Sequence, residues 1–314
     1  MKPLIFAAAK LSPLFTQALT PHYEIVGPMP LEDLMVHPAR AAIEVIAGQG
    51  ESRVRADMMD ALPALKLVSI MGVGYDGVDV PHALQRGAKV SHTPQVLNDD
   101  VADLAIGLML SVTRRLALAD RYVRQGSWSQ GPMPLAVKLS GLRLGLVGMG
   151  RIGQAIAKRA LAFQMPIAYT ARSAKPELPY KFVPTAQALA AEVDVLCVIT
   201  PGGASTFHMI NADVLQALGP KGYLVNVARG SVVDEQALVA ALQAGHIAGA
   251  ALDVFEDEPR PSAALLSMDQ VVLAPHIGSA THQTRQAMAQ LATDNIHLHF
   301  AGSALKTPVP ECQS

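Results

Sequence analysis

The sequence predicts an α/β fold of two doubly wound parallel-sheet domains. Short apolar runs alternate with helical patterns along all 314 residues, which is typical of parallel sheets built from βα units. A long helical segment, 99–124, separates the runs into two sets, and a glycine-rich turn at 148–153 opens the second set. The predicted domains are therefore 1–98 together with 284–314, and 99–283 inserted between them.

Each apolar run predicts one strand. The runs of the first set are 4–7, 24–26, 43–47, 67–71 and 89–90. The runs of the second set are 142–147, 166–170, 193–199, 223–227, 247–252 and 271–274. The early part of 99–124 is apolar nearly all round, as expected of a helix buried between domains or subunits. A last helical stretch, 283–300, is expected to cross back and complete the first domain, because about thirty residues are too few for a domain of their own.

The composition is that of an ordinary globular protein, with 50% hydrophobic and 16% charged residues. The net charge of −1 offers no field that would attract nucleic acid or an anionic membrane, so small-molecule or protein partners are expected. Cys197 and Cys312 suggest no disulfide framework, which fits the cytoplasm. The apolar run 4–9 is short for a signal peptide, no run is long enough to span a membrane, and the histidines show no metal spacing.

Gly148, Gly150 and Gly153 form a G-x-G-x-x-G turn between a predicted strand and a predicted helix. The first glycine permits the tight turn, the second lets the backbone approach phosphate oxygens, and the third lets helix and strand pack closely. The helix N–H groups then face the anion. This order of elements predicts a Rossmann-type dinucleotide-binding domain; a purely structural turn and the similar loop of S-adenosylmethionine enzymes are the alternatives.

The end of the next strand carries no acid to bind the adenosine ribose. Arg172 and Ser173 follow that strand, and the first carboxylate after Gly153 is Glu177. Because a guanidinium offers paired, charged donors to a 2′-phosphate, the sequence favours NADPH, with NADH as a weaker substitute. A solvated basic turn is the alternative interpretation.

Three polar residues follow neighbouring strands of the second set, where doubly wound sheets bind ligands. Arg229 is predicted to bind a substrate carboxylate and polarise its carbonyl, and His276 to donate a proton to the developing alkoxide. Glu258 is predicted to hold the imidazole and raise its pKa. Each residue taken singly has an equally good structural interpretation. Arg229 could form a surface salt bridge, His276 could be a hydrogen-bonded histidine at a strand end, and Glu258 could be a charged loop residue. In the first set, the turn 72–74 has bare amides that can hold an anionic group.

The motifs GMGRIG, NVARGSVVDEQALVAAL, GAALDVFEDEP, VVLAPHIGSAT and MGVGYDGVD together resemble the D-isomer-specific 2-hydroxyacid dehydrogenases. ARSAKP, VITPGG and GPKGYLVNVARG look most like the NADPH-preferring hydroxypyruvate, glyoxylate and hydroxyphenylpyruvate reductases. The resemblance implies Arg229, Glu258 and His276 as the catalytic set and a homodimer with the 99–124 helix at its interface. It also implies a flavodoxin-like substrate domain, with the amides of Val73 and Gly74 on the substrate carboxylate. Asp253 is implied to lie near the nicotinamide.

The predicted cofactor contacts lie in the glycine-rich turn and at the ends of the strands that follow it. They are Gly148, Met149, Gly150, Arg151, Ile152, Gly153, Arg172, Ser173, Thr200, Pro201, Thr206, Val227, Ala228, Asp253 and Gly278. Two departures from the family pattern, at Asp103 and at Gly77-Val78, touch no catalytic role.

The predicted reaction is hydride transfer from NADPH to a small 2-keto acid, glyoxylate or hydroxypyruvate, giving the D-2-hydroxy acid. The alternatives are an aryl-pyruvate reductase of the hydroxyphenylpyruvate type and a non-catalytic NAD(P)-sensing regulator like the C-terminal-binding corepressors. Formate dehydrogenases carry glutamine where Glu258 stands, and phosphoglycerate dehydrogenases often append a regulatory domain. The substrate's side chain is expected near 48–50, Val73, Trp128 and Met133. Trp128 is either a packing anchor or, as in related reductases, a residue that approaches the neighbouring subunit's site.

Overall fold

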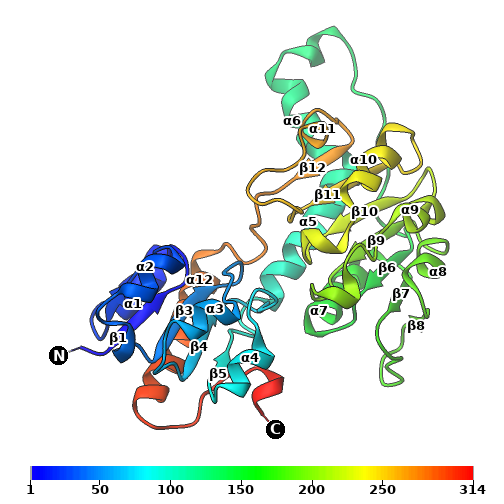
Figure 1. Cartoon of the computed structure of the whole chain (residues 1–314). Coiled ribbons are helices and arrows are strands. Elements are labelled where there is room, and N and C mark those ends of the chain that lie inside the picture. Colours follow the sequence, from blue (N-terminus) through cyan, green and yellow to red (C-terminus); the bar gives the residue numbers. More distant parts are fainter. Residues whose placement is uncertain (1, 314) are drawn as a thin grey trace. The chain divides into compact units, whose positions relative to one another are not determined.

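The protein folds into two compact units, Met1–Leu97 with Thr281–Ser314, and Asn98–Ala280. They are seen in a computed structural model that describes residues 2–313 (Figure 1). The division leaves the second unit as one continuous stretch of chain inserted into the first.

The first unit contains a five-stranded parallel sheet in the order β2-β1-β3-β4-β5. Its strands are β1 (Leu4–Ala7), β2 (Glu24–Val26), β3 (Val45–Gln49), β4 (Leu67–Met71) and β5 (Lys89–Ser91). Its helices are α1 (Pro13–Leu19), α2 (Leu31–Val36), α3 (Ala56–Asp60), α4 (Val80–Gln85) and α12 (His282–Phe300), with short turns η1 (Arg40–Ala42) and η6 (Pro310–Cys312). This strand order is the flavodoxin-like one.

The last part of the chain completes this unit. Helix α12 packs on β4, where the Ser69 hydroxyl donates to the carbonyl of Ala292 at 3.2 Å. Beyond the helix, Pro308 forms an antiparallel bridge with Ser91 at the edge of β5. Residues from both ends of the sequence therefore build one core.

The second unit contains a seven-stranded parallel sheet in the order β12-β11-β10-β9-β6-β7-β8. Its strands are β6 (Leu144–Val147), β7 (Ile167–Thr170), β8 (Lys181–Phe182), β9 (Val195–Val198), β10 (Tyr223–Asn226), β11 (Gly249–Leu252) and β12 (Val271–Leu273). Its helices are α5 (Asn98–Arg114), α6 (Leu116–Arg124), α7 (Arg151–Ala160), α8 (Ala186–Ala190), α9 (Ala212–Leu218), α10 (Glu235–Gln243) and α11 (Ala263–Leu266). The short turns are η2 (Ser127–Gln130), η3 (Leu161–Phe163), η4 (Ala204–Thr206) and η5 (Gly230–Val232).

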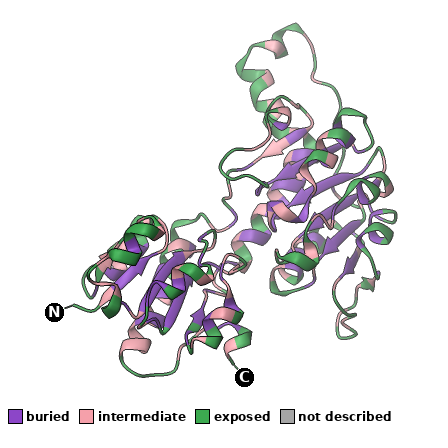
Figure 2. Ribbon diagram, in the orientation of Figure 1, coloured by how far each residue is buried: buried purple, intermediate pink, exposed green. Residues whose placement is uncertain are grey.

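The order of this Rossmann-type sheet reverses between β6 and β9. Helices cover both faces of such a sheet, so its strands read as continuous apolar runs, and β6, β9, β10 and β11 are buried along their whole length (Figure 2). Ligands bind beyond the carboxyl ends of the strands at the point of reversal. The loops after β6 and β9 meet at that point.

The predicted helix 99–124 is two helices in the structure. Arg115 adopts a left-handed backbone conformation, with φ of +53°, and separates α5 from α6. Helix α5 packs on α7, β10 and β11, whereas α6 buries none of its residues, and Leu116 and Val123 are about half exposed. The prediction of one buried helix over this range was wrong beyond Arg114. The two-residue strand β8 was not predicted.

Candidate active site

The glycine-rich turn is closed so tightly that two of its glycines admit no side chain. Gly148 has φ of +110°, and a Cβ there would lie 2.8 Å from the carbonyl oxygen of Ile199. A Cβ on Gly153 would lie 2.4 Å from the carbonyl oxygen of Gly148. A Cβ on Gly150 would meet nothing within 4 Å, so the outer side of the turn has room for a ligand.

Helix α7 begins at this turn with its N-terminal N–H groups uncapped by any side chain. Its N-cap, Gly150, makes no side-chain hydrogen bond, and the N–H groups of the first helical turn, Arg151 to Gly153, have no intrahelical acceptor. Such a terminus favours an anion, because the donors and the helix dipole point the same way. The turn therefore fits the pyrophosphate of a dinucleotide.

The loop after β7 presents a cation and a hydroxyl. Arg172 and Ser173 are exposed directly beyond the strand. The buried Tyr169 hydroxyl accepts from the Lys175 N–H at 2.7 Å, which holds the loop against the sheet. The guanidinium and the hydroxyl at this strand end can both donate hydrogen bonds to an anionic group.

The loop after β9 lies beside the glycine-rich turn. Ile199 contacts Gly148, and Thr200 and Pro201 follow it. The Thr206 hydroxyl donates to the Pro201 carbonyl at 2.8 Å and fixes the curve of the loop. These predicted cofactor contacts flank the point where the strand order reverses.

Glu258 and His276 form a hydrogen-bonded pair beyond the adjacent strands β11 and β12. His276 Nδ1 lies 2.7 Å from Glu258 Oε2, and Glu258 Oε1 accepts from the Phe255 N–H at 3.0 Å. Both side chains are partly exposed. With Nδ1 held by the carboxylate, Nε2 is the ring nitrogen that can exchange a proton with a substrate.

Asp253 holds the histidine loop from below. His276 has φ of +53°, and its N–H donates to the Asp253 carbonyl at 2.9 Å. The Asp253 carboxylate is buried and accepts from the N–H groups of Ile277 at 2.7 Å and Gly278 at 2.8 Å. Burial raises the pKa of Asp253, and these two hydrogen bonds oppose the increase. Because a left-handed non-glycine residue must be held by its surroundings, Asp253 fixes the backbone that aims the imidazole.

The Arg229 loop is organised by Asn226, to which the sequence analysis assigned no role. The buried Asn226 side chain accepts from the Ala228 N–H at 3.0 Å and donates to the Arg229 carbonyl at 3.1 Å. The following residue, Gly230, lies against the chain after β11, since a Cβ there would come within 1.9 Å of the Phe255 carbonyl. The loops that carry Arg229 and Glu258 are therefore in direct contact. Val227 and Ala228, both predicted cofactor contacts, are buried beneath them.

The charges of this site keep the shared proton on the imidazole. The hydrogen bond and charge of Glu258 raise the pKa of His276, against opposing contributions from burial and from the Arg229 charge. Burial favours neutral Glu258, but the hydrogen bond and charge of His276, the Phe255 N–H and the Arg229 charge together lower the pKa of this carboxyl. The pair thus presents an imidazolium to higher pH than an isolated histidine would.

Replacing Glu258 by Gln is expected to move the alkaline limb of the kcat profile for keto-acid reduction to lower pH. In the predicted keto-acid reduction the imidazolium of His276 donates its proton. Loss of the Glu258 carboxylate charge lowers the pKa of His276, so the acid form of the ring disappears at lower pH. The measurement is kcat against pH for wild type and variant under saturating cofactor. Glu177→Gln is the control, because Glu177 is exposed. Glu235→Gln would be a poor control, because the Glu235 carboxylate accepts hydrogen bonds from two backbone N–H groups. An alkaline limb that stays in place would assign it to another group.

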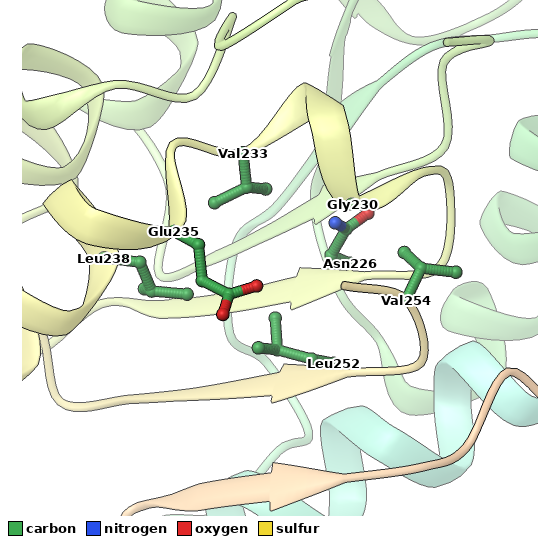
Figure 3. A pocket seen from close by; sticks show the side chains of 7 residues that line it. All are labelled: Asn226, Gly230, Val233, Glu235, Leu238, Leu252 and Val254. Atoms are coloured by element: carbon green, nitrogen blue, oxygen red, sulfur yellow. The ribbon is translucent and has the colours of Figure 1, made fainter. Parts of the chain in front are cut away.

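Two cavities lie around these loops. A cavity of about 10 Å³, room for about one water, lies behind the Arg229 loop and is lined in part by Asn226 and Glu235 (Figure 3). A cavity of about 280 Å³ opens beside the Glu258 and His276 pair. Apart from that pair, the larger cavity is lined by Phe255, Pro259, Pro261, Leu266, Leu273, Ala274 and Pro275. None of these apolar residues was among those predicted to meet the substrate's side chain.

The turn predicted to bind the substrate carboxylate belongs to the first unit. The Gly72 carbonyl accepts from the Thr93 N–H at 2.8 Å, and the Val73 carbonyl lies 2.9 Å from His92 Nδ1. With the carbonyls held in this way, the N–H groups of Val73 and Gly74 donate to no acceptor within residues 2–313. The turn therefore has two donors for an anion.

Trp128, in η2, is 69% exposed, so it is not a packing anchor within its own chain. Neighbouring apolar side chains are also exposed, Leu135 almost completely. Among residues 2–313, no three His, Cys, Asp or Glu side chains are grouped to hold a metal ion. In the same range, no helix is both long and apolar enough to span a membrane.

Comparison with known proteins identifies the family. The D-isomer specific 2-hydroxyacid dehydrogenase NAD-binding domain matches residues 106–278. A glyoxylate/hydroxypyruvate reductase A of Arabidopsis thaliana is 46% identical over 280 residues, which cover 89% of this chain and 90% of that protein. A hydroxyphenylpyruvate reductase of Plectranthus scutellarioides is 47% identical over 268 residues, covering 85% of this chain and 86% of that protein.

A solved structure has the same fold throughout. The NADPH-dependent glyoxylate/hydroxypyruvate reductase of Sinorhizobium meliloti, in complex with NADP and malonate, superposes with a TM-score of 0.94 at 46% identity. The match covers 99% of this chain and 98% of that chain. The chain belongs to the D-isomer specific 2-hydroxyacid dehydrogenases.

Proposed function

We propose that this protein is an NADPH-dependent reductase of small 2-keto acids, glyoxylate or hydroxypyruvate, that yields the D-2-hydroxy acid. The observation that carries the proposal is the 2.7 Å pair of Glu258 and His276, with the Arg229 charge close enough to influence both pKa values. This set lies at the carboxyl edge of the sheet that carries the glycine-rich turn, where a cofactor and a substrate would meet.

Arg229 binds the substrate and activates it. Its planar guanidinium donates paired hydrogen bonds to the substrate carboxylate and polarises the adjacent carbonyl. The amides of Val73 and Gly74 are assigned to the same carboxylate by the family resemblance. Paired hydrogen bonds from the guanidinium fix the keto carbon in one orientation, so that hydride arrives at one face.

His276 supplies the proton. When bound, the nicotinamide of the cofactor would supply hydride to the keto carbon. As negative charge develops on the carbonyl oxygen, His276 Nε2 donates its proton to that oxygen and the ring becomes neutral. The Nδ1–H group stays hydrogen-bonded to the Glu258 carboxylate. The carboxylate keeps the ring protonated before the step and oriented during it, which is the task of the third member of such sets.

The residues of the nucleotide site support NADPH. Gly148 to Gly153 would hold the pyrophosphate, with Met149 buried under the turn, and Arg172 and Ser173 would hold the 2′-phosphate. Thr200, Pro201 and Thr206 border the same edge, while Asp253 and Gly278 support the nicotinamide side through the histidine loop.

The variant Arg172→Asp is expected to lose NADPH use while keeping or improving NADH use. One charge-assisted hydrogen bond contributes about 1.5–3 kcal/mol, so the Arg172 contact favours NADPH by about 10- to 150-fold. The aspartate both removes this attraction and repels the 2′-phosphate. The measurement is kcat/KM for both cofactors at fixed ionic strength.

Lys221→Asp is the matched control, because it changes the charge by the same amount at an exposed residue. Lys221 precedes β10 and so lies at the amino ends of the strands, whereas Arg172 lies at their carboxyl ends. Equal efficiencies of the wild-type protein with NADPH and NADH, or an Arg172→Asp variant that still prefers NADPH, would reject the assignment.

The proposal includes a homodimer in the cytoplasm. Its support in the chain is the group of exposed apolar side chains on α6 and the residues after it, Leu116, Val123, Trp128 and Leu135. Apolar groups gathered on one segment are typical of a surface that another chain covers. Helix α5, by contrast, packs much of its surface against other elements of its own unit.

The larger cavity favours a second candidate, an aryl-pyruvate reductase of the hydroxyphenylpyruvate type. About 280 Å³ of mainly apolar space beside His276 exceeds what the side chain of glyoxylate or hydroxypyruvate can fill. An aromatic ring would bury its surface there.

One experiment separates these functions. Glyoxylate, hydroxypyruvate, pyruvate and phenylpyruvates are compared by kcat/KM with NADPH and with NADH. Highest efficiency with glyoxylate or hydroxypyruvate and NADPH supports the proposal, and highest efficiency with phenylpyruvates supports the second candidate. Cofactor binding without turnover of any keto acid would instead indicate an NAD(P)-sensing regulator.

A further inference from the structure

His208, which has no part in the mechanism above, joins the loop that carries Arg229. His208 lies between η4 and α9, and its N–H donates to the Ser231 carbonyl at 2.9 Å. Two residues later, the Ile210 N–H donates to the Val232 carbonyl at 3.0 Å, and Ile210 pairs with Val233 in a parallel bridge. The backbone around His208 is thus attached to the residues that directly follow Arg229.

The His208 side chain reaches the other catalytic loop. Its Nε2 lies 2.5 Å from Glu256 Oε1, and its Nδ1 lies 3.8 Å from Asp234 Oδ2. Its ring stacks on Phe207, with centroids 3.9 Å apart and planes at 15°. The backbone of His208 has the left-handed conformation, with φ of +49°, which few non-glycine residues adopt. This backbone conformation sets the direction of the His208 side chain.

His208 lies among three carboxylates that hold three loops together. The Glu256 N–H donates to Glu235 Oε2 at 3.2 Å, and Glu235 Oε1 accepts from the Ser262 N–H at 3.1 Å. Glu235 also lines the small cavity behind the Arg229 loop (Figure 3). Asp234 caps α10 through the Ala237 N–H at 2.9 Å. The imidazole of His208 thus lies between the carboxylates of Glu256 and Asp234.

Glu256 is two residues before Glu258, and the Phe255 N–H that binds Glu258 is one residue before Glu256. A displacement of Glu256 therefore changes the position of Glu258 relative to His276. We propose that His208 is a positioning residue that fastens the Glu258 loop to the Arg229 loop through its contacts with Ser231 and Glu256, and thereby keeps Glu258 on the catalytic histidine. The kinetic part of this inference rests on the proposed function.

The hydrogen bonds of His208 go to Ser231 and Glu256, not to His276 or to a predicted cofactor contact, so its loss should not act by removing a substrate contact. It should weaken the Glu258 bond to His276, which lowers the pKa of His276 in the same direction as Glu258→Gln but by less. The effect should therefore fall on kcat and on its alkaline limb, while the Kd for NADPH stays within about twofold.

The test uses His208→Asn, because asparagine tolerates the left-handed backbone and carries no charge. Glu256→Gln removes the partner charge from the other side. His246→Asn is the matched control, since His246 is exposed in the same unit. In the cofactor-free protein, the pKa of His276 is measured by NMR titration, with its resonance assigned from its absence in His276→Asn. This readout does not depend on turnover.

His208→Asn and Glu256→Gln are each expected to lower the pKa of His276, by less than Glu258→Gln does, and to move the alkaline limb of kcat by the same amount. The double variant should shift no further than the larger single variant, because both changes break one bond. His208→Lys, whose ammonium group can donate to the Glu256 carboxylate, should return the pKa of His276 toward its wild-type value. His246→Asn should change nothing.

An unmoved His276 pKa in folded His208→Asn or Glu256→Gln would overturn the inference, as would additive shifts in the double variant. If His208→Asn fails to fold, Glu256→Gln alone decides. A protein that reduces no keto acid would reject the proposed function, but the NMR titration would still report whether His208 acts on His276.

Discussion

The variant His276→Ala is expected to lose about 100-fold or more in kcat, the scale of a lost general acid, with the Kd for NADPH nearly unchanged. The reason is geometric: Glu258 holds Nδ1 at 2.7 Å, so Nε2 is the proton donor, and alanine removes both nitrogens. The nucleotide turn lies on other loops of the same unit and keeps its hydrogen bonds. The measurements are kcat under saturating substrate and cofactor binding by fluorescence titration.

Because position 276 has a left-handed backbone, alanine there also introduces strain. His276→Asn removes the acid with less backbone cost, and agreement of the two variants would show that the loss is chemical. The melting temperature, with His246→Ala as the control, shows how much of the loss in kcat comes from destabilisation of the fold. Wild-type kcat in either variant at 276 would remove this histidine from the mechanism.

The variant Arg229→Ala is expected to lose about 10²- to 10⁴-fold in kcat/KM, with KM raised and kcat lowered together. A guanidinium that donates two charge-assisted hydrogen bonds contributes about 1.5–3 kcal/mol through each. One acts on the carboxylate in the ground state and the other on the carbonyl as its charge grows, so both kinetic constants change. Arg229→Lys should recover only part of the loss, because lysine keeps the charge and not the fork.

The check is a full set of keto-acid kinetics for both variants at fixed ionic strength. Arg229 Nη1 also donates to the Ala228 carbonyl at 2.8 Å, so the melting temperature must be measured beside the kinetics. Normal KM and kcat in a folded Arg229→Ala variant would contradict the proposed role.

The fold class was predictable because buried parallel strands need uninterrupted apolar runs, and this chain has them. The break at Arg115 was not, because arginine carries no preference for a left-handed backbone and the flanking segments both read as helix. Strand β8 pairs with β7 at the edge of the sheet and is only two residues long. Two residues are too few for a hydrophobic pattern to indicate a strand.

The hydrogen-bonded pair of Glu258 and His276 was predictable because the two residues follow strands that are neighbours in a parallel sheet. The roles of Asn226, Asp253 and His208 depend on loop conformation, which has no period in sequence. His208 and Glu256 are 48 residues apart, and the carbonyl of Ser231, on a third loop, holds the backbone N–H of His208. The apolar cavity likewise gathers residues from β12, α11 and the chain before them.

The interrupted unit has a consequence for synthesis on the ribosome. Residues 98–280 emerge as one stretch and contain every strand of their own sheet, so they can fold as soon as they are clear of the exit tunnel. The first 97 residues emerge earlier yet lack α12, which covers β4. At about 5–20 residues per second, they wait about 10–40 s for it. During that interval the apolar face of β4 is open to chaperones and to other nascent chains, so the unit that begins before the inserted one completes its fold after it.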